Sequence, residues 1–290
     1  MISFESSFRF RKIRAYVLSA SLMLCSFSAQ SQEAAVFRTL QIDGPRALAE
    51  AILDITHNHP GTIITYEDVR YRDSGDIQDV TGRVPGAGER RLLGPRNSSI
   101  RAEYSVLTES NRLAEPDVAI TRIVEAYNSA NNPGNFTIER TGSIFHVVPL
   151  RSRDTDGNWV SEQPIFDLTV SFDAPATNGL EVANRICEEL SSVTGSTIGL
   201  GVAPFSLLAS KELDFSVSDE KARDVMVRLL AEIEPALTWQ LNYDPFTEWY
   251  FLNLLSADPP KVIMDARELE LSSPIELDPN SGSIFRPRRD

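Results

Sequence analysis

The residues with the clearest potential for chemistry are two histidines close to a carboxylate. The 290-residue chain has 3 histidines, and His57 and His59 are separated by one residue. Asp54 lies one helical turn before His57, so the three side chains could ligate a transition metal such as zinc. On a helix, side chains two positions apart point to different faces, and a histidine at a helix C-terminus is favourable to the dipole in any case. We expect a polar helix terminus, with metal binding as the alternative.

Other motifs that would indicate catalysis are missing from the sequence. Cys187 shares an apolar helical stripe with Val182, Ala183 and Ile186, which favours a buried thiol over a reactive one. His146 lies in an expected strand. The chain has no Gly-x-Ser-x-Gly, P-loop, His-Glu-x-x-His or Cys-x-x-Cys motif. We therefore predict no catalytic residue and no cofactor.

Two segments have the composition of a protein-binding surface. Arg90 and Arg91 belong to an arginine-rich stretch, residues 72–99, which could bind an acidic partner or a glycan or could be a plain solvated loop. Aromatic residues cluster in an expected hairpin near residue 250, where strand alternation exposes some of them. We predict Trp249 and Tyr250 as partner contacts, because an exposed aromatic face or a free edge can receive a partner strand.

The composition excludes several classes of function. Hydrophobic residues make up 42% of the chain and charged residues 24%, so it can bury a core. Asp and Glu number 41 against 28 Lys and Arg, and the net charge is -13. An acidic surface argues against non-specific binding to nucleic acid or anionic lipid. The 2 cysteines cannot build a disulfide framework.

The first thirty residues have the pattern of a secretory signal peptide. A basic group comes first: Arg9, Arg11, Lys12 and Arg14. The apolar run that follows, residues 15–29, is short for a membrane span and ends in small residues. We expect cleavage near residues 28–31, export to the periplasm, and no transmembrane segment in the mature chain. The alternatives are an uncleaved anchor, an extracellular location, and lipid attachment at Cys25.

Four segments share one apolar spacing, at i, i+1, i+4, i+5 and i+8, which predicts four amphipathic helices. The stripes are Ala47, Leu48, Ala51, Ile52 and Ile55; Ala119, Ile120, Ile123, Val124 and Tyr127; Val182, Ala183, Ile186, Cys187 and Leu190; and Val225, Met226, Leu229, Leu230 and Ile233. Pro116 fits a first helical turn, and Asn178 with Glu181 makes a capping box. Ser218 is the expected start of the fourth helix, and Gly195 ends the third.

Between the helices the sequence has short β-rich runs. Strands are expected at residues 36–42, 62–66, 100–107, 136–138, 144–148, 166–172, 197–202, 213–217, 237–243 and 249–254. Each half then reads β-α-β followed by β-α-β-β and ends in a hairpin. This order predicts an α+β fold made of two copies of a small unit, each with two helices packed on a small mixed sheet. Tandem duplication explains the order, and two unrelated α/β halves are the alternative.

The organisation of the chain follows from these elements. The first unit spans residues 33–152 and contains the loop 72–99 as an insertion. A polar linker, residues 153–164, leads to the second unit at residues 165–258. Residues 259–290 form a Pro-rich, largely extended tail with one possible hairpin that begins at Val262–Met264.

The second unit resembles the secretin and TonB N-terminus short domain. The positions that match the first helix of that family are Leu180, Ala183, Leu190 and Gly195, and those that match the second helix and its following strand are Ala222, Val225, Leu229, Leu230, Leu237, Thr238 and Trp239. Residues 36–150 look like a more divergent copy. The resemblance implies a periplasmic domain that docks other proteins. No pore or receptor sequence follows in the printed chain, so we expect a free-standing pair.

These observations favour an exported, non-catalytic protein-interaction module whose partner is another protein of the cell envelope. Binding at a sheet edge or at the last hairpin is expected. Two alternatives stay open: a metal-dependent or other hydrolase with its site between the two halves, and a binder of a small molecule or glycan.

Overall fold

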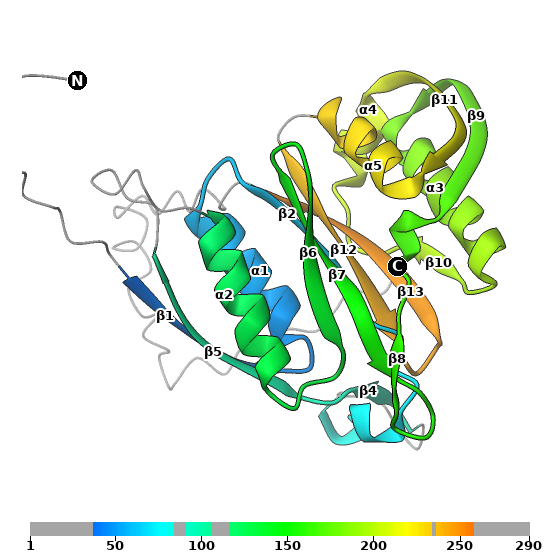
Figure 1. Ribbon diagram of the computed structural model, residues 1–290. Helices are drawn as coiled ribbons and strands as arrows, with labels where there is room; N and C mark the ends of the chain where they lie inside the picture. Colours follow the sequence, from blue (N-terminus) through cyan, green and yellow to red (C-terminus); the bar gives the residue numbers. More distant parts are fainter. Residues whose placement is uncertain (1–36, 84–90, 106–115, 234–235, 258–290) are drawn as a thin grey trace, which may run out of the picture. The chain divides into compact units, whose positions relative to one another are not determined.

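The computed structural model describes residues 37–83, 91–105, 116–233 and 236–257 (Figure 1). All of these residues belong to one compact unit of the chain. The expected signal peptide (residues 1–30), the tail (residues 259–290) and Arg90 lie outside the described residues. No helix in the described ranges is both long and apolar enough to cross a membrane.

The first half places two helices between two small sheets. Its main elements are β1 (Phe37–Gly44), α1 (Ala47–Asn58), β2 (Ile63–Glu67), β5 (Ser98–Ser105), α2 (Pro116–Ser129), β6 (Asn135–Thr141) and β7 (Ile144–Arg153). Strands β1 and β5 form an antiparallel pair. Strand β7 pairs parallel with β2 and antiparallel with β6. Helix α1 contacts β1, β5 and β2, and α2 contacts β5 and β6, so the helices touch both sheets.

The strands and long helices of the second half follow the same order and pairings, and the short helix α4 is an addition. Its elements are β9 (Thr169–Asn178), α3 (Gly179–Thr194), β10 (Ile198–Leu200), α4 (Phe205–Ser210), β11 (Glu212–Lys221), α5 (Ala222–Ala231), β12 (Leu237–Asp244) and β13 (Trp249–Ser256). Strands β9 and β11 pair antiparallel, and β13 pairs parallel with β10 and antiparallel with β12. The fold is α+β. The expectation of helices packed on a single mixed sheet was incomplete, because each helix pair also contacts a two-stranded sheet.

The two halves share one continuous sheet of order β10-β13-β12-β2-β7-β6. The junction is a parallel pairing of β12 with β2, in which Gln240 lies opposite Tyr66 and Leu241 opposite Glu67. The amide of Asp68 extends this pairing by donating to the carbonyl of Leu241 at 2.8 Å.

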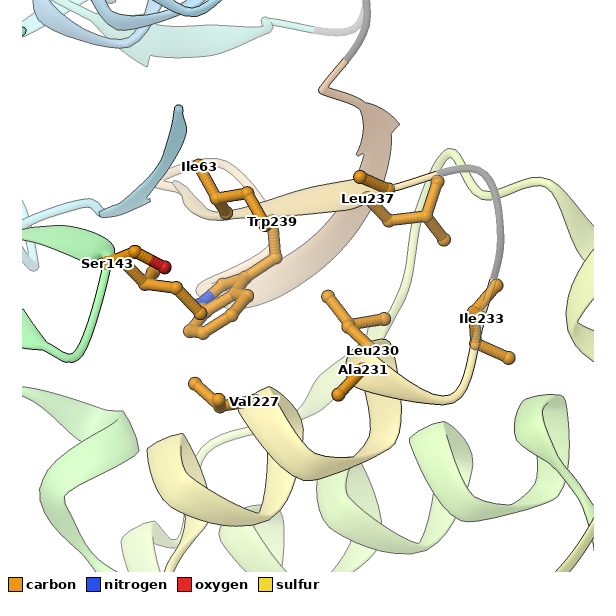
Figure 2. A pocket seen from close by; sticks show the side chains of 10 residues that line it. Ile63, Ser143, Val227, Leu230, Ala231, Ile233, Leu237 and Trp239 are labelled. Atoms are coloured by element: carbon orange, nitrogen blue, oxygen red, sulfur yellow. The ribbon is translucent and has the colours of Figure 1, made fainter. Parts of the chain in front are cut away.

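Side-chain alternation shows that the two helix pairs cover opposite faces of this sheet. In β2, Tyr66 stacks on Phe136 on the face covered by α1 and α2. Gln240 of β12 lies on the same face and donates to the carbonyl of Ala49 in α1 at 3.0 Å. Its neighbour Trp239 points to the other face, where it meets α5 across the pocket of Figure 2.

The local signals at the helix ends are confirmed in the second half, with one exception. The Asn178 side chain accepts from the amide of Glu181 at 3.1 Å, and Gly195 ends α3 with φ 68. The expected start of the fourth helix at Ser218 was wrong, because β11 continues through a bulge to Lys221. The amide of Ala222 then donates to the carbonyl of Leu168 at 2.9 Å, which anchors the start of α5 instead.

Two segments expected to be irregular contain regular structure. The described part of the insertion holds two short strands and two 3-10 turns, and the linker holds one strand. These elements are η1 (Ser74–Asp76), β3 (Ile77–Asp79), η2 (Thr81–Arg83), β4 (Leu93–Pro95) and β8 (Trp159–Ser161), followed by η3 (Ile165–Asp167). Strand β3 pairs with β4, and β8 pairs with the end of β7. The segment between the halves is therefore attached to the sheet.

Candidate interaction site

Two of the three residues considered as metal ligands, His59 and Asp54, bind other groups. The ring nitrogens of His59 lie 3.0 Å from the carbonyl oxygen of Ile55 and 3.1 Å from that of Ser105, and the residue is buried. Asp54 binds Arg38 at 2.7 Å and accepts from the Tyr104 hydroxyl. His57 lies in the last turn of α1, as expected for a helix terminus. Among the described residues, no group of three or more His, Cys, Asp or Glu could hold a metal ion.

The Cys187 thiol lies in the core, as its apolar stripe predicts. The residue is 3% exposed, and burial raises the pKa of its thiol to about 12. A thiol with that pKa is protonated at neutral pH and therefore unreactive.

The last hairpin separates the two aromatic residues that were expected to contact a partner. Trp249 is 46% exposed and lies beside Phe251, with 6.3 Å between the ring centroids. Tyr250 is 3% exposed and packs on Tyr243 in the core, with 4.8 Å between the centroids. This corrects the expectation for Tyr250, because strand alternation puts neighbouring side chains on opposite faces.

Arginines of the insertion form ion pairs with carboxylates of the same chain. Arg91 binds Asp79 at 3.1 Å and has 73% of its side chain exposed. Arg72 donates through both terminal nitrogens to Glu162, in the segment after β8, at 2.7 and 3.3 Å. Part of the arginine content therefore attaches the insertion to the rest of the fold, which the sequence did not indicate.

A buried carboxylate links the halves where β12 meets β2. The side chain of Asp68 is fully buried and accepts hydrogen bonds from the hydroxyls of Tyr66 and Tyr71 at 2.8 and 2.6 Å. It also accepts from Arg46 Nε at 3.1 Å and from the amide of Tyr243 at 3.3 Å. Burial, followed by the charge of Asp68, raises the pKa of Tyr66 and Tyr71 well above the ordinary value, so both phenols stay protonated donors.

A second buried charged group lies on the other face of the sheet. Arg223 of α5 is 4% exposed and reaches Asp167 at 2.9 Å and Glu67 at 3.4 Å, and it also contacts Glu139 of β6. Burial raises the pKa of Glu67 to about 7, against the opposing effect of Arg223. The sequence signal that could have revealed this buried group is Arg223 itself, a charged residue at the edge of the apolar stripe of α5, three residues before Met226.

His146 of β7 lies beside this group. It is fully buried, and burial, followed by the charge of Arg223, lowers the pKa of its imidazole to about 3. Thr65 Oγ1 lies 2.8 Å from His146 Nδ1. Within the described part of the chain, His146 Nε2, Arg223 Nε and Trp239 Nε1 are buried without a hydrogen-bond partner. Glu67 is too buried to touch a substrate, so these groups do not form an open active site.

The two edges of the larger sheet differ in how many of their outward N–H and C=O groups have hydrogen-bond partners. At the β10 edge, the amide of Ile198 donates to the Ser191 hydroxyl at 2.9 Å. At the β6 edge, Asn128 of α2 binds both the amide and the carbonyl of Phe136, at 2.9 and 2.8 Å. Phe136 therefore points its peptide groups away from β7, and by alternation so do Ile138 and Arg140.

The outward peptide groups of Ile138 and Arg140 form the open part of this edge. In the ranges that the structure describes, no other group pairs with their outward N–H and C=O. Ile138 is half-buried against the core, and Arg140 is exposed. An unpaired edge of this kind can form main-chain hydrogen bonds with another strand.

No family model, no curated protein and no solved structure matches the chain.

An apolar pocket lies between α5 and the shared sheet (Figure 2). Its volume is about 550 Å³. Val227 and Leu230 of α5 line one side, and Trp239 lies opposite them (Figure 2). Ile63 and Leu237 extend the apolar lining. The volume is in the range of small-molecule sites, but the lining offers few polar groups that would orient a polar ligand.

Proposed function

We propose that this protein is an exported, non-catalytic interaction module that binds an extended segment of a partner protein at the open edge of β6. The observation that carries the proposal is the outward orientation of the Ile138 and Arg140 peptide groups, which lack partners among the described residues. The pattern of residues 1–30 and the resemblance of the second half to a periplasmic docking domain support export and a partner in the cell envelope.

The β6 edge suits strand addition better than the β10 edge at the other end of the sheet. Strand β10 has three residues, and the amide of Ile198, which points outward, is already capped by Ser191. Strand β6 has seven residues, and Asn128 caps only its start. The remaining length supplies two residues whose N–H and C=O groups can pair with a partner strand.

The side chains along this edge indicate what the partner strand should carry. Ile138 and Arg140 lie on the same face of β6, two residues apart. The guanidinium of Arg140 is held near the hairpin turn by its hydrogen bond to the carbonyl of Gly142 at 2.8 Å. A segment with an apolar residue and, two positions away, an acidic residue would make favourable cross-strand pairs with both side chains.

A backbone-specific substitution tests the proposal. Arg140→Pro removes the outward N–H without removing a hydrogen bond of the β6–β7 ladder, and proline is tolerated on an edge strand in that orientation. Arg140→Ala is the matched control, because it removes the same side chain and keeps the N–H. Both variants should keep the wild-type circular dichroism spectrum. After crosslinking in the native envelope, mass spectrometry should recover one partner with the Ala variant and lose it with the Pro variant.

Equal recovery with the two variants would contradict strand addition at β6. The exposed Trp249 gives a second arm of the same experiment, since its side chain is the accessible aromatic of the last hairpin. Loss of the partner with Trp249→Ser, together with full recovery with Arg140→Pro, would move the binding site to the hairpin.

A further inference from the structure

The two halves are joined by a relation that can be repeated. In each half the sheet runs in the order first strand, last strand, penultimate strand, as β2-β7-β6 and as β10-β13-β12. Because β12 pairs parallel with β2, the equivalent strands β2 and β10 run in opposite directions, and the helix pairs lie on opposite faces. A half-turn about the direction in which the strands are stacked, with a shift of three strands, therefore carries one half onto the other.

The same relation, applied once more, places β10 of a second copy beside β6. Counted back from the last pair of each hairpin, Ile138 of β6 is equivalent to Leu241 of β12. Counted from the pairings with β7 and β13, Leu200 of β10 is equivalent to Tyr66 of β2. The carbonyl of Leu241 points at β2, where it accepts from the amide of Asp68 at 2.8 Å. The open groups of Ile138 thus correspond to groups that pair at the internal junction.

Leu200 supplies the open backbone groups of the β10 edge. The amide of Gly201 donates to the carbonyl of Leu252 in β13 at 2.9 Å, so by alternation the N–H and C=O of Leu200 point away from β13. Among the described residues, no other group binds them. In the register of the internal junction, the carbonyl of Leu200 in the second copy accepts from the amide of Ile138.

The short length of β10 suffices for this pairing, because the internal junction is equally short. Only two residues of β2 pair with β12 there. The carbonyl of Ile64, earlier in β2, accepts from the Thr238 hydroxyl instead. Ile198 is equivalent to Ile64, and its amide likewise has a hydroxyl partner, Ser191. The side-chain contact of Ile198 therefore leaves the pairing residue of β10 open.

An exposed aromatic side chain at the β10 edge is equivalent to one that is buried at the internal junction. Phe205 is 47% exposed, whereas its equivalent Tyr71 is 6% exposed and reaches Tyr243 of β12, with 6.2 Å between the ring centroids. The residue of β6 that is equivalent to Tyr243 is Arg140. In the continued sheet, the Phe205 ring of the second copy therefore meets the Arg140 guanidinium, which favours a cation–π contact.

The exposed ring of Trp249 also has a covered equivalent. Trp249 and Ile144 each begin the last strand of their half, directly after the hairpin turn. Ile144 lines the pocket together with Val227 of α5. The helix of the first half that is equivalent to α5 is α2. In the continued sheet, α2 of the neighbouring copy lies over Trp249 and covers the aromatic face of the last hairpin.

We propose that this chain assembles head to tail, with β6 of one copy paired parallel with β10 of the next, so that the copy–copy junction repeats the junction between the halves. This assembly rests on the proposed strand addition at β6 and identifies the added strand. Because the two surfaces differ, it forms linear oligomers and not closed two-fold dimers. The amide of Val202, the equivalent of Asp68, is held by Asn253 Oδ1 at 2.8 Å, so the copy–copy junction has one hydrogen bond fewer. We expect a Kd on the order of 10–100 µM.

Sedimentation velocity of the chain, purified after export, tests the assembly. The wild-type weight-average mass should rise about two-fold or more between about 1 µM and about 500 µM. Ile138→Pro removes the outward N–H and keeps the β6–β7 ladder, and Phe205→Lys places a like charge beside Arg140. Both variants should stay monomeric over this range. The controls Ile138→Ala and Val193→Lys, the latter at a 56% exposed position, should assemble within about three-fold of the wild-type Kd.

A mixture of the two blocked variants distinguishes head-to-tail pairing from a two-fold dimer. Ile138→Pro keeps the β10 edge, and Phe205→Lys keeps the β6 edge. An equimolar mixture should therefore form a dimer with one copy of each variant and no larger species. A dimer retained by either variant alone would show a symmetric interface and would overturn the proposal, as would a mixture of folded variants that stays monomeric.

A wild-type chain that stays monomeric at about 500 µM would also overturn the assembly. The proposed function has its own outcome: recovery of a different envelope protein, lost with Arg140→Pro, would assign β6 to that protein. If Ile138→Pro does not fold, the comparison of Phe205→Lys with Val193→Lys decides, because both positions are exposed. Equal assembly by these two variants would contradict pairing at β10.

Discussion

The two buried charged groups that link the halves are built differently. Asp68, on one side of the junction, accepts from two tyrosine hydroxyls, one arginine and two backbone amides. The group around Arg223, on the face that carries Trp239, has three carboxylates around one guanidinium but leaves the Nε of that guanidinium unpaired. His146 and Trp239 beside it each have a ring nitrogen without a partner in the described residues.

This difference gives the two groups different roles. A buried carboxylate with a full set of donors fixes its neighbours in one geometry. A buried group with too few partners shifts its protonation equilibrium instead, as the raised pKa of Glu67 and the lowered pKa of His146 show. We therefore expect Asp68 to determine the stability of the junction, and Glu67 with His146 to determine how that stability depends on pH.

Substitution of Asp68 should have the largest effect. Asp68→Asn replaces one acceptor oxygen with a donor. Either the hydroxyls of Tyr66 and Tyr71, which bind Oδ1, or Arg46 and the amide of Tyr243, which bind Oδ2, then lose their acceptor. We expect the free energy of unfolding to fall by about 3–5 kcal/mol, measured by urea denaturation. Asp214→Asn, at an exposed position, is the control and should change stability by less than about 0.5 kcal/mol. A similar small change for Asp68→Asn would refute its structural role.

Loss of Arg223 should lower the free energy of unfolding by less, because one of its carboxylate partners can contact water and another can take up a proton. Arg223→Met keeps the buried aliphatic stem and removes the charge, but Glu139 is partly exposed and Glu67 can take up a proton. We expect a loss of about 2–3 kcal/mol in the same assay. The double variant Arg223→Met, Glu67→Gln should recover part of this loss. Arg185→Met, at an exposed ion pair, should cost under about 1 kcal/mol.

The pH dependence of the Glu67→Gln variant should reveal the histidine. The folded-state pKa of His146 is about 3, against 6.5 for the free side chain, so only the unfolded chain takes up the proton as the pH falls below 6.5. Without Glu67, unfolding free energy should therefore drop by about 2 kcal/mol between pH 7 and pH 5. Urea midpoints across this range measure the effect. A flat profile for this variant would contradict the low pKa of His146.

The complementary variant should show the opposite slope. The folded-state pKa of Glu67 is about 7, against 4.5 when unfolded, so the folded chain takes up the proton first as the pH falls. His146→Asn keeps a partner for Thr65 and removes the imidazole, and its stability should rise by about 2 kcal/mol from pH 7 to pH 5. In the wild-type chain the two contributions nearly cancel over this interval. A His146→Asn variant that loses stability on acidification would show that Glu67 is not the titrating group.

The smallest expected effect concerns a single donor to Asp68. Tyr71→Phe removes one of the five hydrogen bonds that this carboxylate accepts and leaves four. We expect a loss of about 1 kcal/mol, well below that of Asp68→Asn. Thermal unfolding at pH 7 is the measurement. A loss as large as that of Asp68→Asn would mean that the Tyr71 hydroxyl alone, and not the set of five donors, accounts for the contribution of Asp68 to stability.

Local patterns predicted most elements of the fold but not the connections between its halves. Four apolar stripes predicted the four long helices. At the ends of α3, the Asn178 cap and Gly195 are confirmed, but the carboxylate of Glu181 binds the Thr177 hydroxyl instead of completing the capping box. The pairing of β8 with β7 was missed because Trp159–Ser161 is only three residues long and lies in a polar segment after a turn. Such a strand is formed by its partner rather than by its own propensity.

The sequence could not place the exposed side chains and open backbone groups of the predicted binding surface. The sequence indicated a sheet edge or the last hairpin, and Trp249 is exposed there. It could not separate Tyr250 from Trp249, because which face of a strand is buried depends on the helices that cover it. The open peptide groups of Ile138 and Arg140 depend on which strand ends the sheet, which no local pattern encodes.

The sequence by itself determined the periodic elements, the acidic surface and the absence of familiar catalytic motifs, since these follow from residue types and short-range spacing. The tertiary structure decided that β12 joins β2, that the helix pairs lie on opposite faces, and that Asp68, Glu67, Arg223 and His146 become buried at the junction. Burial sets the pKa of Glu67 and of His146, because desolvation depends on neighbours that are distant in the chain, such as Arg223, which lies 156 residues after Glu67.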